Sequence, residues 1–98
     1  MKNNLRFVDV SEKTKKKLKK FKSDKAIVEG FSRVLKELQT APDPTKIGER
    51  KHGLYSNCYG IHITKNHSLV YIYMSKEDLV ILVDLDDHKN LYGRDNRS

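Results

Sequence analysis

Three apolar, strand-like segments follow one another closely in the second half of this 98-residue sequence. They cover about residues 55–64, 69–73 and 79–85, and short polar turns separate them. Strands joined by such short turns pair antiparallel, because a parallel crossover needs about a dozen residues or more. The sequence therefore predicts a three-stranded antiparallel meander. Its last strand is apolar on both faces until Asp84, which predicts a central position in the sheet.

Two helices are predicted before the meander, over residues 11–22 and 25–39. In the first, Ser11 is placed as N-cap, and Thr14, Leu18 and Phe21 form a narrow stripe toward the core. Its remaining lysines are expected in water: Lys13, Lys16, Lys17, Lys19 and Lys20. The second helix is strongly amphipathic and ends at a proline-containing segment, so the pair reads as an αα-hairpin. Gly30 inside it predicts close packing against the first helix.

Residues 5–10 alternate as a strand that precedes the hairpin. The order strand, two helices and then three antiparallel strands predicts an α+β fold with the helices packed on one face of the sheet. The other face is expected to be open. We expect residues 1–98 to form a single domain, with residues 94–98 as a frayed polar tail.

The net charge of +7 is concentrated in one segment. Residues 1–25 contain ten Lys or Arg against three Asp or Glu, whereas residues 26–98 balance to zero. Such a basic segment suits a polyanion or an acidic protein, and a solvated helix face is the simpler alternative. The only cysteine, Cys58, cannot form an internal disulfide, which fits a reducing cytoplasm. No signal peptide or membrane-spanning run is recognised.

All four histidines (His52, His62, His67 and His88) fall between residues 51 and 92. Strand alternation places His62 on the face opposite to Ile61 and Ile63, which is the open face if these isoleucines meet the helices. Metal-independent cleavage of RNA needs a base for the 2′-OH, an acid for the 5′-oxygen and cations for the phosphate. Histidines supply the first two. Candidates for the third are Arg50, Lys51, Lys89 and Arg94, while Tyr55 and Tyr92 are suited to stack on bases.

Other roles for these residues stay open. A strand histidine is commonly a hydrogen-bonded surface residue, and His67, in a turn, fits that description best. The histidine spacings match no zinc pattern, and Cys58 more resembles inert filler than a nucleophile. From chemistry alone the chain is a basic α+β domain with a possible action on RNA.

The segment from Asn66 to Tyr71 is preceded by His62-Ile63-Thr64 and followed by an apolar strand that ends in the segment from Asp87 to Gly93. In these features, and in its strand, hairpin and sheet order, the chain resembles the RelE/ParE toxin superfamily. It is most similar to the YafQ and YoeB branches of bacterial toxin–antitoxin ribonucleases. The resemblance implies a toxin that cuts mRNA in the ribosomal A site and is neutralised by an antitoxin.

Site residues follow from the resemblance by position. His62 corresponds to an active-site histidine on the second strand, His88 to a C-terminal catalytic histidine, Tyr92 to its aromatic partner and His52 to a loop histidine, while Asn66 stands where that branch has an acidic residue. Together these five are the predicted catalytic set. The predicted substrate-binding set is Arg50, Lys51, His67, Lys89, Lys16, Lys17 and Lys20. No metal or cofactor is predicted. The family's last-strand arginine is replaced here by Asp84.

Three functions are compatible with this scaffold. The histidine set favours a ribosome-dependent mRNA endonuclease. The alternatives are a ParE-like inhibitor of DNA gyrase and a non-catalytic module that binds RNA or an antitoxin. The expected partners are a cognate antitoxin, the ribosome and mRNA, with no membrane; the toxin alone is expected to be monomeric and to form a hetero-oligomer with the antitoxin.

Overall fold

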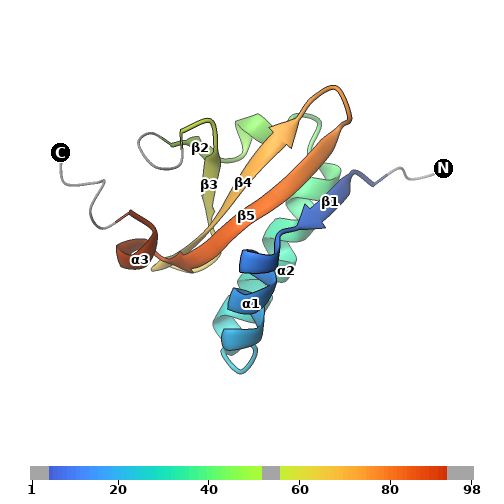
Figure 1. The fold of residues 1–98 in the computed structure, drawn as a ribbon. Coiled ribbons are helices and arrows are strands. Elements are labelled where there is room, and N and C mark those ends of the chain that lie inside the picture. Colours follow the sequence, from blue (N-terminus) through green and yellow to red (C-terminus); the bar gives the residue numbers. More distant parts are fainter. Residues whose placement is uncertain (1–4, 52–55, 93–98) are drawn as a thin grey trace.

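The computed structural model describes residues 5–51 and 56–92 (Figure 1). Its elements, in chain order, are β1 (Phe7–Val10), α1 (Glu12–Lys20), α2 (Lys25–Thr40), the short 3-10 helix η1 (Pro44–Lys46), β2 (Glu49–Arg50), β3 (Tyr59–His62), β4 (His67–Met74), β5 (Leu79–Asp87) and α3 (His88–Tyr92). The predicted tail at residues 94–98 lies outside the described residues. Within them, no helix is long and apolar enough to cross a membrane.

The strands form one mixed sheet in the order β1-β5-β4-β3-β2. The antiparallel meander is confirmed as β3, β4 and β5, and β5 lies inside the sheet as its two apolar faces predicted. The N-terminal strand β1 pairs parallel to β5, with Phe7 opposite Leu79. The two-residue strand β2 adds an edge that the sequence did not predict. The first meander strand is shorter than predicted, since β3 begins at Tyr59.

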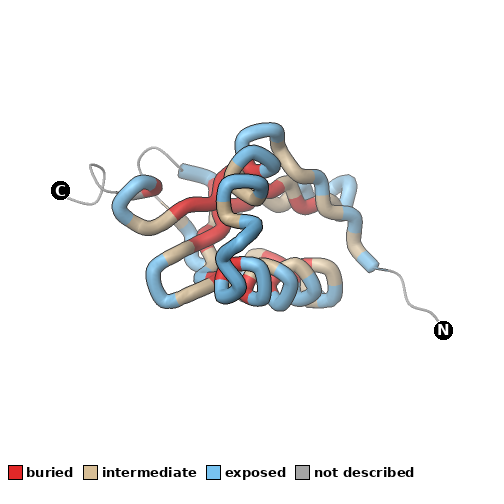
Figure 2. Tube along the Cα trace, turned by 90° about the horizontal axis from the view of Figure 1, so that it is seen from below, coloured by how far each residue is buried: buried red, intermediate tan, exposed pale blue. Residues whose placement is uncertain are grey.

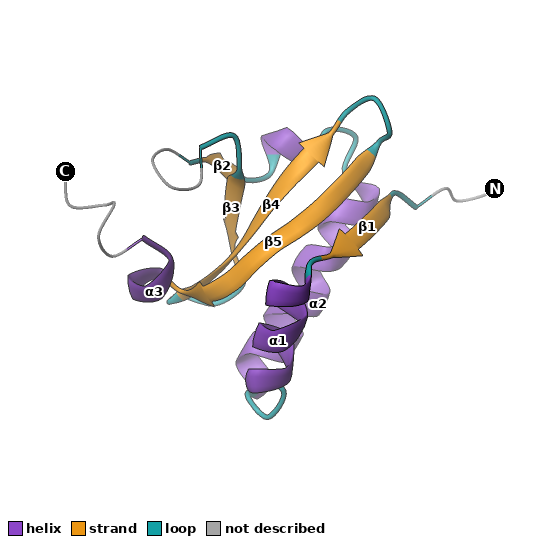
Figure 3. Cartoon of the chain, in the orientation of Figure 1, coloured by secondary structure: helices purple, strands orange, loops and turns teal. Residues whose placement is uncertain are grey.

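The αα-hairpin is also confirmed, and α1 and α2 lie together on one side of the sheet (Figure 3). Ser11 caps α1 by accepting a hydrogen bond from the Thr14 backbone, and Asp24 caps α2 by accepting one from the Ile27 backbone. The main core lies between the helices and the sheet, where the buried segments of Figure 2 gather. Its buried members are Ile27, Val34, Leu38, Ile63, Leu69, Tyr71, Val80, Leu82 and Leu85.

A β-bulge shifts the alternation along β5. Val80 and Leu82 point into the main core. Leu85 also points there, although it follows Leu82 by three residues and strict alternation would turn it to the other face. The shift occurs where the β4–β5 register changes between Val70 and Tyr71, so that Val83 is the additional residue of β5. Beyond the bulge, alternate residues of β5 therefore point to the face away from the helices.

That second face was predicted to be open, but α3 covers part of it. Leu91 of α3 packs with Cys58 and Val70 in a small buried cluster, separate from the main core. Ile72 and Val83 lie against the same cluster. The short helix α3 therefore covers one end of the face on which His62 lies. The first residue of α3 is His88.

The prediction that Gly30 packs against the first helix is wrong. A Cβ on Gly30 would overlap the backbone carbonyl of Ile63, just after β3. The glycine is thus required by the approach of α2 to the sheet.

Gly30→Ala is therefore expected to destabilise the protein, although alanine ordinarily stabilises a helix interior by about 1 kcal/mol over glycine. Overpacking against a backbone carbonyl costs about 1–3 kcal/mol. Urea unfolding of Gly30→Ala and of the exposed α2 control Ser32→Ala measures the difference. A Gly30→Ala variant as stable as the wild type would show that α2 and the sheet separate without cost.

Candidate active site

Two histidines far apart in the sequence meet on the face away from the helices. The rings of His62, the last residue of β3, and His88, the first residue of α3, lie in an edge-to-face arrangement with centroids 4.7 Å apart. Ser68 of β4 lies opposite His62 in the β3–β4 register. Its Oγ shares a hydrogen bond of 2.8 Å with Nε2 of His88. The cluster thus joins two strands and a helix.

Burial and the neighbouring His62 lower the pKa of His88 below its ordinary value of 6.5. Lys51 and His67 act in the same direction, while Asp87 opposes them. His88 is therefore predominantly neutral at neutral pH. A neutral imidazole in a hydrogen-bonded, half-buried setting can accept a proton from a bound group.

The same row of side chains continues into β5. Asp86 pairs with Ser68 in the β4–β5 register, so His62, Ser68 and Asp86 lie side by side across three strands. Asp86 and Asp84 are only 4% and 2% exposed. Two buried carboxylates are costly unless cations and hydrogen-bond donors meet them.

Those cations come from α1, and this corrects a prediction. Lys17 was expected in water, but its Nζ lies 2.7 Å from Asp86 Oδ2 and 3.1 Å from Asp84 Oδ1. Lys13 lies 3.1 Å from Asp84 Oδ2. Burial acts to lower the pKa of Lys17, but the bonds to Asp86 and Asp84 outweigh it and raise that pKa. Burial acts to raise the pKa of Asp86, but hydrogen bonds from Lys17, the Asp87 backbone and Asn90 lower it overall.

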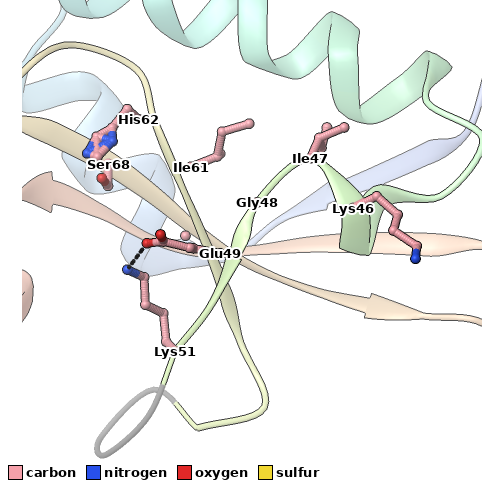
Figure 4. A pocket seen from close by; sticks show the side chains of 9 residues that line it. Lys46, Ile47, Gly48, Glu49, Lys51, Ile61, His62 and Ser68 are labelled. Atoms are coloured by element: carbon pink, nitrogen blue, oxygen red, sulfur yellow. Dashed lines mark hydrogen bonds and ion pairs between the residues drawn. The ribbon is translucent and has the colours of Figure 1, made fainter.

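A cavity of about 300 Å³ opens beside His62 (Figure 4). His62 and Ser68 line one end, Lys46 and Ile47 lie at the other, and Gly48 and Glu49 lie between them. Lys51 also lines it and forms an ion pair of 3.4 Å with the exposed carboxylate of Glu49. The lining therefore combines apolar residues with two lysines, one carboxylate and His62, and the cavity is large enough for part of a nucleotide.

Two predicted residues lie nearby but contribute differently. His67 points to the helix face, where its ring meets that of Phe21 edge to face and its Nδ1 lies 2.9 Å from Thr64 Oγ1. Asn66 is an exposed turn residue, and its backbone carbonyl accepts a hydrogen bond of 3.0 Å from the His88 backbone N–H. Neither side chain joins the His62–His88 cluster.

The remaining predicted cations are spread over the surface. Lys16 and Lys20 are exposed on α1, and Lys89 is exposed on α3. Arg50 is exposed in β2 and donates to Asn57 Oδ1 at 3.3 Å. Of the predicted catalytic residues, His52 lies outside the described residues, as do Tyr55 and Arg94, and the side chain of Tyr92 is likewise not described. In residues 5–51 and 56–92, no group of three or more His, Cys, Asp or Glu residues is placed to hold a metal ion.

Sequence reasoning missed Ser68, Asp86 and Asn90. Asn90 of α3 donates to Asp86 Oδ1 at 3.2 Å, and its backbone donates to Asp87 Oδ1 at 2.8 Å. The alternation that placed His62 on the open face would also have found Ser68, had the strand register been known. No sequence signal locates Asp86 on that face, because plain alternation from Leu82 points it into the core.

Comparison with known proteins relates this chain to the toxins of toxin–antitoxin systems. Residues 8–92 match the family model described as ParE toxin of type II toxin-antitoxin system, parDE. No curated protein sequence matches the chain.

Three solved structures share the fold at low sequence identity. A metal-bound toxin from Helicobacter pylori is 21% identical, with a TM-score of 0.73 over 89% of this chain and 99% of that one. A YafQ mutant from E. coli is 16% identical, with a TM-score of 0.73 over 90% and 99%. The heterotetrameric YoeB-YefM toxin-antitoxin complex from Staphylococcus aureus is 21% identical, with a TM-score of 0.67 over 83% and 94%.

The lowered pKa of Asp86 predicts a pH dependence of stability. Because the folded-state pKa lies below 3.8, the carboxylate contributes stability above that pH and loses it as the pH falls through the folded-state value. Asp86→Asn should therefore be less stable than the wild type at pH 7, and the gap should narrow below about pH 4. Urea unfolding at both pH values measures this, and a gap independent of pH would contradict it.

Proposed function

We propose that this chain, which belongs to the ParE toxin family of type II toxin–antitoxin systems, is a toxin that cleaves mRNA on the ribosome without a metal. The observation that carries the proposal is the meeting of His62 and His88, with ring centroids 4.7 Å apart, on the sheet face away from α1 and α2. A toxin that blocks its target by binding alone needs no such pair of proton-transfer groups.

In this mechanism, His88 accepts the proton of the 2′-OH of the nucleotide at the cut. The 2′-oxygen attacks the phosphorus, the bond from phosphorus to the 5′-oxygen breaks, and His62 protonates that oxygen. The products are a 2′,3′-cyclic phosphate and a free 5′-OH. The lowered pKa of His88 supports its role as the base, because its acceptor form dominates at neutral pH.

Lys46 and Lys51 line the cavity with His62 and Ser68, and Lys51 is the one whose charge also lowers the pKa of His88, so we assign it the role of offsetting charge on the phosphate. Its position supports it as a replacement for the last-strand arginine of the family, where this chain has Asp84. That carboxylate is buried and paired with lysines of α1, so it does not present an open negative charge to the RNA.

A cognate antitoxin is the second proposed partner. The solved complex of YoeB with YefM is described as a toxin–antitoxin complex, and this chain shares the toxin fold. The exposed lysines of α1 suit an acidic segment of such a partner. Action on mRNA at the ribosome would place the toxin in the cytoplasm.

Inhibition of DNA gyrase is the competing function, and the match to the ParE family model favours it. The two are separated by mapping RNA 5′ ends and testing for trapped gyrase–DNA complexes in cells that express the toxin. Codon-phased RNA cuts without DNA breaks support the nuclease. DNA breaks without RNA cuts support inhibition of gyrase. If neither RNA cuts nor DNA breaks are found, the non-catalytic binding function remains.

Removing either imidazole should abolish most RNA cleavage. General acid–base catalysis contributes about 10²–10⁴-fold, so His62→Ala and His88→Ala should each slow cleavage by about that factor. The control Ser75→Ala alters an exposed turn residue between β4 and β5 and should cut at the wild-type rate. Cleavage unchanged in both histidine variants would reject the mechanism.

The cleavage rate should also depend on pH with an acidic limb below pH 6.5. A base must be deprotonated to act, and the pKa of His88 is lowered, so activity should rise as the pH increases through that lowered value. The pH profile of single-turnover cleavage measures this limb. If the acidic limb of the wild-type pH–rate profile lies above pH 6.5, His88 is not the base.

Exposed lysines of α1 are expected to contact phosphates without reading sequence. Replacing Lys16 and Lys20 by Gln should weaken ribosome binding and reduce the salt slope by about one unit for each lost contact. A double replacement of Lys25 and Lys36 on α2 is the charge-matched control. Equal slopes in the two double variants would mean that α1 makes no special phosphate contact.

A further inference from the structure

We propose that Lys17 and Asn90 are positioning residues that hold α3, and therefore His88, at the active site through their shared contact with Asp86. The inference rests on the proposed function only in taking His88 as a proton-transfer residue. It gives Lys17 a role other than the phosphate contact expected from the sequence.

The first link runs from α1 to the end of β5. Lys17 Nζ lies 2.7 Å from Asp86 Oδ2, and its side chain is only 23% exposed. Thr14 donates to the Leu82 carbonyl at 3.0 Å, and Ser11 donates to the Val83 carbonyl at 3.1 Å. These two hydrogen bonds fix the start of α1 along β5, so the lysine reaches Asp86 from a held helix.

The second link runs from Asp86 to α3. Oδ1 of Asp86 accepts hydrogen bonds from the Asp87 backbone at 2.9 Å and from Asn90 Nδ2 at 3.2 Å. Asp87 in turn accepts from the Asn90 backbone at 2.8 Å, which caps the first turn of α3. One oxygen of Asp86 therefore faces α1 and the other faces α3.

His88 begins this helix, so its ring position depends on how the first turn is held. A helix of five residues has little stability of its own. Leu91 anchors its far end in the small apolar cluster, and the polar link through Asp86 anchors its start. Loss of the link should let the imidazole leave Ser68 and His62 and become more solvated. A displacement of about 1 Å in a catalytic group can cost about 10²-fold in rate.

The test is an NMR titration of the His88 ring protons in the full chain, which does not depend on RNA cleavage. Lys17→Met and Asn90→Ala should both raise the pKa of His88 toward its ordinary value of 6.5, because the ring loses burial and the proximity of His62. Asn90→Ala changes no charge and alters an exposed side chain, so it tests position in a protein that still folds. Lys17→Arg keeps both carboxylate contacts and should titrate like the wild type.

Lys13→Met is the matched control. It removes the same charge from the same helix, but the ion pair that it breaks is with Asp84 and not with Asp86. It should leave the His88 titration unchanged. Equal shifts in Lys13→Met and Lys17→Met, or a wild-type titration in Asn90→Ala, would overturn the inference.

Kinetics separates positioning from phosphate binding. With the chain acting as a nuclease, Lys17→Met should lower kcat by about 10–100-fold while KM changes little, and Lys17→Arg should restore kcat. A change confined to KM and its salt dependence would make Lys17 a phosphate ligand and reject the positioning role. If no variant or wild type cleaves RNA, the titration still decides the inference, while the proposed function fails separately.

Discussion

The bulge at Val83 is the constraint on which the arrangement of the site depends. Without it, alternation from Val80 and Leu82 would direct Asp84 and Asp86 under the helices and turn Leu85 outward. The additional residue reverses that phase, so Leu85 completes the core while both carboxylates reach the other face. The same strand, β5, therefore contributes to the core and also ends at the polar site. The chain continues from β5 directly into α3, which begins with His88.

Electrostatics explains why a helix on one side of the sheet takes part in a site on the other. Asp84 and Asp86 are buried beside the face that carries His62, and α1 delivers Lys13 and Lys17 to them across the edge of β5 beyond β1. The lysines of α1 therefore have two different roles. Those at the sheet edge neutralise buried carboxylates, whereas Lys16 and Lys20 remain exposed and contribute to the field that attracts polyanions.

Much of the fold follows from local patterns in the sequence. The apolar spacing of α2, the caps at Ser11 and Asp24 and the short turns of the meander all act within a few residues, so they are readable without a structure. The convergence of His62 and His88 was predicted from strand alternation and from the family resemblance together. The parallel pairing of β1 and the lysine–carboxylate contacts depend on residues about 70 positions apart, so local patterns do not predict them. The bulge depends on the register between β4 and β5, which local patterns do not predict either. For the same reason Lys17 looked like a solvated residue and Gly30 like a helix–helix contact.

The central claim is that His62 and His88 act on one phosphate of a bound RNA. A structure of the toxin on a ribosome, with an mRNA carrying a 2′-O-methyl group at the cleavage site, tests this most directly. The account predicts that the phosphate contacts both imidazoles, with Lys51 beside it and the blocked 2′-oxygen next to His88. An mRNA bound away from this face, or a phosphate in contact with neither histidine, would contradict it.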